Sequence, residues 1–147
     1  MLAKEQLTSF GVQGVQFIDF ENDPLVDLTQ FNILYVNGGN TFRLLKSFQN
    51  KHTKENIQKF LKGGGLYIGV SAGSSVLGLD IQALGDIGMD ENNIKLLNTS
   101  GYGILPFSIV PHFVDEFIGK LREQNYYPLK DGHAIWADLN GNYEEIS

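Results

Sequence analysis

Short apolar runs alternate with amphipathic segments along this 147-residue chain, and this alternation limits the folds that it can adopt. Strands are predicted where the runs are rich in β-branched and aromatic residues, at 15–20, 31–37, 66–70 and 107–111. Strands that are separated by helical segments favour parallel pairing through right-handed crossovers. The predicted fold class is therefore α/β.

Helical sequence lies between the second and third predicted strands. Asn40 and Thr41 are cap-type residues ahead of one apolar stripe, and Thr53 is predicted to cap a helix that buries a second stripe. The stripes are Phe42, Leu44, Leu45 and Phe48, and then Ile57, Phe60 and Leu61. Three glycines at 63–65 are expected to end the second helix.

The rest of the chain has a different pattern. Residues 79–100 are rich in glycine, aspartate and asparagine, which predicts a loop with a short helix or strand. Residues 133–138 and 143–146 flank an Asn-Gly pair, which predicts a C-terminal hairpin with a tight turn.

The composition fits one globular domain over residues 1–147, because 42% of the residues are hydrophobic and can form one core. A formal net charge of -6 argues against nucleic acid and anionic membranes as partners. The sequence contains no cysteine, so it offers no disulfide and no thiolate ligand for a metal. No apolar stretch approaches the roughly 20 residues of a membrane helix, and the first ten residues lack a signal-peptide pattern, so we expect a cytoplasmic protein.

The sequence GVSAG at residues 69–73 follows the third predicted strand and has the G-x-S-x-G pattern of a nucleophile elbow. Ligands and chemistry gather at the carboxyl ends of parallel strands. A sharp turn there would direct the Ser71 hydroxyl into a cleft and leave the Ala72 amide free to stabilise an oxyanion. The alternative is a tight connection without chemistry, because the chain contains 17 glycines.

A glycine pair ends the preceding predicted strand. The sequence NGGN at residues 37–40 places bare backbone amides at a second carboxyl edge, and the Gly39 amide is a candidate oxyanion donor. Gly38 and Asn40 are candidates for contact with a substrate. A glycine turn followed by an asparagine helix cap would give the same sequence.

A serine nucleophile needs a base, and the chain contains three histidines. His112 ends an apolar run at a third strand edge and is the first candidate, with a purely structural histidine as the alternative. His133 is the second candidate. His52 lies between polar helical segments and is predicted to be on the surface.

An acid should orient His112, and two aspartates are candidates. Asp86 lies in a glycine-flanked loop after Ser71, and Asp131 precedes the predicted hairpin. Either of them could instead be a turn aspartate, which is the common use of aspartate beside glycine. Asp115 and Glu116 are too close in sequence to His112 to orient its ring.

These residues resemble a known family. The stretches LYVNGGNTFRLLKSF, GGGLYIGVSAGSSVLG and IVPHF occur in the order and with the spacing of serine peptidases of the dipeptidase E (aspartyl dipeptidase) type, which are relatives of cyanophycinase. The resemblance covers about residues 11–146. It implies a three-layer fold, similar to class I glutamine amidotransferases, in which helices flank a mostly parallel, flavodoxin-like sheet.

The resemblance also implies a role for each candidate residue. It assigns the nucleophile, the general base and the two oxyanion-hole amides to Ser71, His112, Gly39 and Ala72. The family's acid has been placed at two positions, which here are Asp131, in place of the family's glutamate, and Asp86. The implied reaction is hydrolysis of short peptides through an acyl-enzyme, without a metal or an organic cofactor.

The chain departs from the family pattern in two respects. Members usually carry a strand, a helix and another strand ahead of the segment where this chain starts, so an open edge or apolar face of the sheet is expected. The chain would then be a truncated reading frame, a fragment, or a protein that forms a homodimer through that sheet. The loop at residues 78–88 lacks the family's Thr-Thr-Asn-Asp run, so a preference for N-terminal aspartate is not carried over.

Three functions are compatible with this sequence. The first is a serine peptidase, and the second is an inactive binding homologue that keeps the elbow for packing. The third is an α/β-hydrolase esterase, which also uses G-x-S-x-G but needs its acid between the serine and the histidine, at Asp86. The short length of the chain argues against the third.

Overall fold

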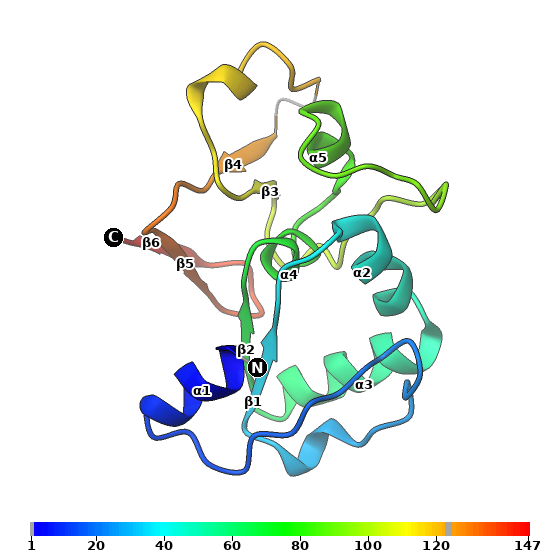
Figure 1. Cartoon of the computed structure of the whole chain (residues 1–147), viewed down its shortest axis with the longest axis vertical. Coiled ribbons are helices and arrows are strands. Elements are labelled where there is room, and N and C mark those ends of the chain that lie inside the picture. The colour runs from blue at the N-terminus through cyan, green and yellow to red at the C-terminus, as the bar shows by residue number, and fades with distance from the viewer. Residues whose placement is uncertain (1, 123–124) are drawn as a thin grey trace.

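The computed structural model describes residues 2–122 and 125–147, and short helices alternate with short strands along them (Figure 1). The helices are α1 (Leu2–Ser9), the 3-10 helix η1 (Leu28–Gln30), α2 (Thr41–Phe48), α3 (Lys51–Lys62), α4 (Ala72–Ser75), α5 (Gln82–Asp86) and the 3-10 helix η2 (Asp115–Phe117). The strands are β1 (Ile33–Val36), β2 (Leu66–Gly69), β3 (Ser108–Val110), β4 (Tyr126–Pro128), β5 (Ala134–Ala137) and β6 (Tyr143–Ile146). The predicted α/β class is confirmed. Within these residues, every helix is too short or too polar to traverse a lipid bilayer.

The strands pair two by two. β1 lies parallel to β2, with Val36 opposite Gly69, and β3 lies parallel to β4. β5 and β6 form the predicted antiparallel hairpin. The predicted parallel pairing is found, but the described strands form three two-stranded sheets rather than one continuous sheet. β3 packs against the helices α4 and α5, and its backbone bonds pass to β4.

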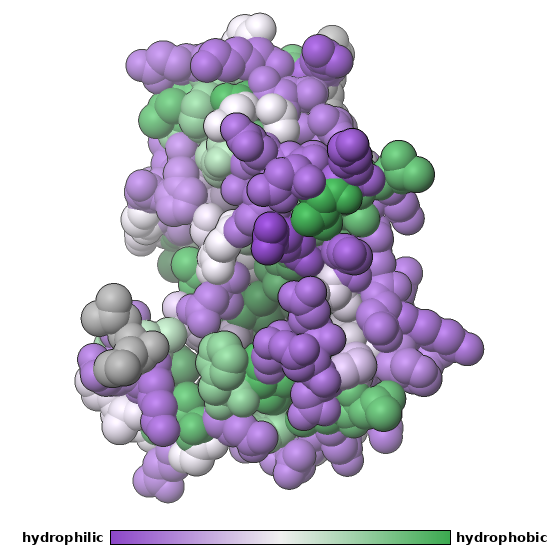
Figure 2. All heavy atoms as spheres, turned by 45° about the vertical axis from the view of Figure 1, so that its right-hand side comes forward, coloured by the Kyte–Doolittle hydropathy of each residue, from purple (hydrophilic) through white to green (hydrophobic). Residues whose placement is uncertain are grey.

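Helices cover the first strand pair. α2 and α3 lie on one side of β1 and β2, and α1 and the β5–β6 hairpin lie on the other (Figure 1). The main core consists of Leu28, Leu34, Val36, Phe42, Leu45, Phe48, Ile57, Phe60, Val76 and Ile81. Hydrophilic side chains cover most of the face shown in Figure 2, and apolar side chains are visible between them near its middle.

Residues 15–20 form no strand, so this prediction was wrong. A strand needs a partner for its backbone groups, and none of the described strands pairs with this segment. Asp19 instead starts a turn in which its carbonyl and its carboxylate accept bonds from the residues that follow. Phe17 is 85% exposed, whereas Phe20 packs against the main core.

Asparagines cap both helices that connect β1 to β2. The Asn40 side chain accepts a hydrogen bond of 3.1 Å from the backbone of α2, as predicted. Asn50 caps α3, which therefore begins before Thr53, and the prediction of Thr53 as the cap was wrong. Thr53 is buried because it lies one turn before Ile57, on the helix face that packs into the core.

The C-terminal part contains one strand that the sequence pattern does not predict. β4 has three residues and ends in Pro128, which has no N–H to donate, so it lacks the usual strand pattern. The predicted short helix or strand within 79–100 is found as α5 and as a bridge between Asp80 and Ser100. In the hairpin, the backbone N–H of Asp138 donates to the carbonyl of Asn142 and closes the turn.

A cavity of about 1010 Å3 lies between the N-terminal segment and β1. Its lining comes from α1, from residues 10–21, from β1 and from α2, and it extends as far as Gly38. Phe10 and Phe17 line it and are 83% and 85% exposed. Apolar surface is therefore accessible beside β1.

Candidate active site

Ser71 connects β2 to α4 in a strained conformation. Its φ and ψ angles are 54° and -115°, which residues other than glycine rarely adopt. The flanking glycines are required by close packing. A Cβ atom at Gly69 would lie 2.3 Å from the Gly73 carbonyl oxygen, and one at Gly73 would lie 2.3 Å from the Val36 carbonyl oxygen. The spacing of glycines around Ser71 thus follows from backbone contacts that leave no room for a side chain.

Tyr67 of β2 supports this turn, a role that no sequence motif indicates. Its hydroxyl donates a hydrogen bond of 2.7 Å to the Gly73 carbonyl. Burial raises the pKa of the Tyr67 phenol well above its ordinary value, and the neighbouring Tyr102 adds to this effect. Tyr67 therefore stays neutral and keeps its proton for the Gly73 carbonyl.

The register of β1 and β2 brings Gly38 beside Ser71. Val36 lies opposite Gly69 at the ends of the two strands, and Gly38 and Ser71 each follow two residues later. A Cβ atom at Gly38 would lie 3.1 Å from the Ser71 Cβ and 3.5 Å from its Oγ. The absence of a side chain at Gly38 therefore leaves space next to the Ser71 hydroxyl.

Two backbone amides near Ser71 have no partner within the described part of the chain. The N–H groups of Gly39 and Ala72 donate to no described carbonyl or side chain. Gly39 has a φ of 145°, a conformation that favours glycine, and Ala72 is only 1% exposed. Ala72 is buried, and a buried N–H without a partner costs free energy, whereas Gly39 is exposed. A ligand oxygen that accepted the bond from Ala72 would therefore be bound favourably, and the Gly39 N–H is free to donate to the same oxygen.

His112 and Asp131 lie in contact at the ends of β3 and β4. The distance from His112 Nδ1 to Asp131 Oδ1 is 2.6 Å, and the two side chains are 51% and 79% exposed. The strand ends are held together beyond the paired residues, because the Leu129 N–H donates to the Val110 carbonyl and the Phe113 N–H to the Leu129 carbonyl. Nδ1 donates to the carboxylate at this distance, which leaves Nε2 available as a base.

The other candidate acid lies elsewhere. Asp86 ends α5, and its Oδ1 accepts a bond of 3.3 Å from the side chain of Gln82. Among the described residues, Asp86 makes no hydrogen bond or ion pair with His112. The structure therefore brings only one of the two predicted acids to the predicted base.

Asn40 is committed to local structure. Its side-chain carbonyl caps α2, and its Nδ2 donates a bond of 3.0 Å to the Glu91 carbonyl. Asp90, which sequence reasoning missed, accepts a 3.0 Å bond from the Thr41 N–H. These bonds tie the loop after α5 to the start of α2 and hold the NGGN segment in place.

The remaining histidines have other surroundings. His52 is exposed near the start of α3, as predicted. His133, the second candidate base, contacts Glu145 through its Nδ1. Neither Glu145 nor its other partner, Tyr127, was singled out from the sequence, since no local motif marks them. Within residues 2–122 and 125–147, no three histidine, aspartate or glutamate side chains are grouped so that they could hold a metal ion.

Comparison with known sequences assigns the family. Residues 2–141 match the family described as Peptidase family S51. The chain belongs to peptidase family S51. The S51 match includes Ser71, His112 and Asp131, and the expected resemblance to dipeptidase E is confirmed.

Individual relatives of this S51 chain are named peptidase E. It is 34% identical over 151 residues to peptidase E of Salmonella newport strain SL254, and 32% identical over 93 residues to peptidase E of Streptomyces coelicolor. These matches cover 97% and 63% of this chain, but 63% and 37% of the relatives. The chain thus spans less than two thirds of the length of either relative.

A solved structure has the same fold as this S51 chain. The crystal structure of a peptidase E-like protein from Listeria monocytogenes EGD-e matches with a TM-score of 0.83 and 25% sequence identity. The match covers 97% of this chain and 74% of that chain. The peptidase E fold is therefore present over nearly all of the described residues.

Proposed function

We propose that this chain is a serine peptidase that hydrolyses short peptides, with Ser71 as nucleophile, His112 as general base and Asp131 as the acid that orients His112. The observation that carries the proposal is the 2.6 Å contact between His112 and Asp131. This contact pairs a histidine with a carboxylate near the end of a strand. The chain belongs to a peptidase family, and its Ser71 lies in a strained turn between two glycines.

The reaction would begin when Ser71 Oγ attacks the carbonyl carbon of the peptide and its proton passes to His112 Nε2. The carbonyl oxygen becomes an oxyanion, which the N–H groups of Gly39 and Ala72 stabilise. The C–N bond then breaks, and His112 gives its proton to the leaving amine. Water attacks the acyl ester and returns a proton through His112 to Ser71, which releases the carboxylic acid product.

Asp131 acts through His112 in this scheme. Its carboxylate fixes the tautomer in which Nδ1 carries the proton, so Nε2 can accept the proton of the serine, and it stabilises the imidazolium that forms. Gly38 would provide the space for the scissile carbonyl beside the hydroxyl. Asn40 would contribute by holding the NGGN segment rather than by binding substrate, because both ends of its amide are bonded.

We also infer that the layering resembles that of class I glutamine amidotransferases. The support is the position of helices on both sides of the β1–β2 pair and the packing of α4 against both β2 and β3 (Figure 1). In such folds the chemistry lies at the carboxyl ends of the parallel strands. Ser71 follows β2 and His112 follows β3, which agrees with this arrangement.

The esterase alternative is disfavoured by the position of its acid. That reaction would need Asp86 beside His112, but Asp86 is bonded to Gln82. The inactive binding homologue remains as the second outcome of the test below.

The proposal is tested by incubating the purified chain with a panel of dipeptides and tripeptides and measuring amino-acid release. The wild type and the control Ser9→Ala, a change at the exposed end of α1, should cleave the same peptides. Ser71→Ala should reduce cleavage to background while the melting temperature stays near that of the control. Cleavage that persists in Ser71→Ala would contradict the proposal, and a folded wild type that cleaves nothing would favour the binding homologue.

A further inference from the structure

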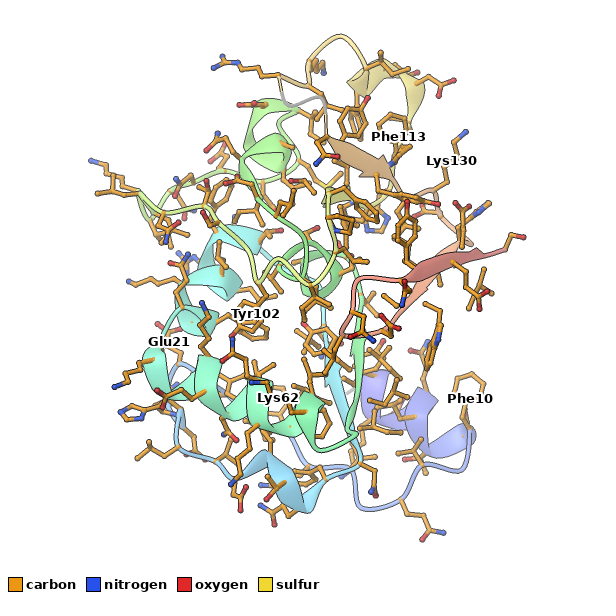
Figure 3. The ribbon with its side chains drawn as sticks, turned by 180° about the vertical axis from the view of Figure 1, so that it is seen from behind. Phe10, Glu21, Lys62, Tyr102, Phe113 and Lys130 are labelled. Atoms are coloured by element: carbon orange, nitrogen blue, oxygen red, sulfur yellow. The ribbon has the colours of Figure 1, made fainter. Side chains whose placement is uncertain are left out.

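The turn that carries Asp131 is held weakly by its own residues. It connects β4 to β5, and the His133 N–H donates a 3.2 Å bond to the Lys130 carbonyl. Gly132 adopts a φ of 86°, which lets the chain reverse here. Within the described residues, the Asp131 carboxylate bonds only to His112. Figure 3 shows Lys130, the exposed neighbour of Asp131, beyond the end of β4.

One carboxylate in the hairpin contacts both flanks of this turn. Glu145 Oε1 contacts His133 Nδ1, and Glu145 Oε2 accepts a hydrogen bond from the Tyr127 hydroxyl. Tyr127 is the central residue of β4, and His133 immediately precedes β5. Glu145 therefore closes a ring of contacts around the segment that contains Asp131.

The hairpin is in turn fixed to the strand that leads to His112. The ring of Phe107, next to β3, lies 5.0 Å from that of Tyr127 and 4.8 Å from that of Tyr143 in β6. Aromatic pairs at these distances attract each other and bury apolar area. The strand that carries Glu145 and the strand that leads to His112 are thus parts of one packed unit.

We propose that Glu145 is a positioning residue that holds the turn so that the Asp131 carboxylate meets His112 Nδ1. This inference rests on the proposed function, because its effect on the reaction passes through the pair of Asp131 and His112. The His133 and Glu145 side chains are 36% and 41% exposed, so their contact adds little to global stability. Its effect on the reaction rate would be larger, because a misplacement of a catalytic group by about 1 Å can reduce the rate about 100-fold.

The variants follow from the two contacts of Glu145. Glu145→Ala removes both and should lower kcat about 10- to 100-fold with KM changed less than about twofold. Glu145→Gln can accept from Tyr127 and donate to His133, so it should retain most of the activity. The matched control is Glu144→Ala. Glu144 is the neighbour of Glu145 in β6 and lies opposite Trp136 of β5, and its side chain makes no hydrogen bond or ion pair to any described residue.

A double-variant cycle separates positioning from general destabilisation. In an Asp131→Asn background, Glu145→Ala should lower kcat by less than about twofold, because the carboxylate that it positions is gone. A merely structural role would lower kcat equally in both backgrounds. Should Glu145→Ala fail to fold, the same cycle is run with Tyr127→Phe, which removes one contact.

A measurement that does not need activity completes the test. The ring Nδ1 proton of His112 is followed by NMR, with His112→Asn used to assign it. The proton should be visible in the wild type and in Glu144→Ala, and lost by exchange in Asp131→Asn and Glu145→Ala. An unchanged proton signal and an unchanged kcat in Glu145→Ala would overturn the inference, even if Ser71→Ala abolishes cleavage. Persistent cleavage by Ser71→Ala would instead overturn the proposed function and leave the proton measurement as the test of positioning.

Discussion

His112 Nδ1 lies 2.6 Å from Asp131 Oδ1, across the ends of two parallel strands. The register of β3 and β4 creates this contact. Val110 pairs with Pro128 at the ends of the two strands, and the chain continues from there for two residues to His112 and for three to Asp131. Both side chains are largely exposed, so the contact contributes little to global stability. Its significance therefore lies in fixing the direction of the imidazole ring.

The two candidate acids give opposite predictions. Asp131→Asn keeps the size of the side chain but replaces a carboxylate, which only accepts hydrogen bonds, with an amide that can also donate to His112 Nδ1. The tautomer of His112 that leaves Nε2 free as a base is then no longer favoured, so kcat/KM for a cleaved peptide should fall about 100- to 10,000-fold. Asp86→Asn should leave kcat/KM within about twofold, because Asp86 contacts Gln82 and not His112. Steady-state kinetics of both variants make the comparison, and a larger loss in Asp86→Asn would refute the assignment of Asp131.

Gly38 leaves the space beside the Ser71 hydroxyl. Gly38→Val would place Cβ 3.1 Å from the Ser71 Cβ and add two methyl groups next to Oγ, so turnover should fall at least about 100-fold through misplaced substrate. The control Gly119→Val introduces the same side chain where no atom lies within 4 Å. Peptide cleavage by both variants is compared at matched folded fractions. Equal activity would mean that the substrate does not approach through this space.

Gly73 supports the turn through its close approach to β1. Gly73→Ala places a methyl group 2.3 Å from the Val36 carbonyl oxygen, and neither backbone segment can yield without moving a strand. We expect the free energy of unfolding to fall by about 1–3 kcal/mol. Urea denaturation measures this value, and Gly119→Ala should change it by less than about 0.5 kcal/mol. A Gly73→Ala protein as stable as the wild type would show that the turn is looser than described.

Acid should weaken the turn of the C-terminal hairpin. The hydrogen bond from the Asn142 side chain lowers the pKa of the Asp138 carboxyl, and backbone N–H groups of Asn142 and Asn140 add to this effect against desolvation. Because the folded pKa lies below the unfolded value, the ionised form stabilises the fold above the unfolded pKa, and this contribution is lost as pH falls through the folded pKa. Asn142→Ala should therefore lower the urea midpoint at neutral pH, and the difference should shrink below about pH 4.

The control for this pH dependence is Asn93→Ala, since Asn93 is exposed and has no hydrogen bond to a described residue. It should leave the midpoint unchanged at each pH. A difference between Asn142→Ala and the wild type that is the same at neutral and acidic pH would show that the bond does not depend on the ionised carboxylate.

Local requirements made much of the fold predictable from the sequence. The glycines around Ser71 are needed because backbone atoms pass within 2.3 Å of their Cβ positions, and such contacts permit only one residue type. Asn40 caps α2 through its own side chain, so its role is also visible in the sequence around it. The C-terminal hairpin follows from alternating residues and an Asn-Gly turn for the same reason.

Contacts between distant segments were not predictable. The choice between Asp86 and Asp131 depends on the pairing of β3 with β4, and three residues that end in Pro128 give no strand signal. Residues 15–20 have the composition of a strand, but a strand also needs a neighbour, and none of the described strands pairs with them. Glu145 meets Tyr127 and His133 only after the hairpin docks, so no sequence spacing indicates it.

The most direct test of the central claim is covalent labelling of the folded chain with a fluorophosphonate, followed by mass spectrometry of the digested protein. Labelling requires an activated serine hydroxyl next to a base. We predict that the label is found on Ser71, that Ser71→Ala carries none, and that His112→Ala is labelled about 100-fold or more slowly than the wild type. A label on another serine, or labelling of Ser71 at the same rate in His112→Ala, would contradict the account.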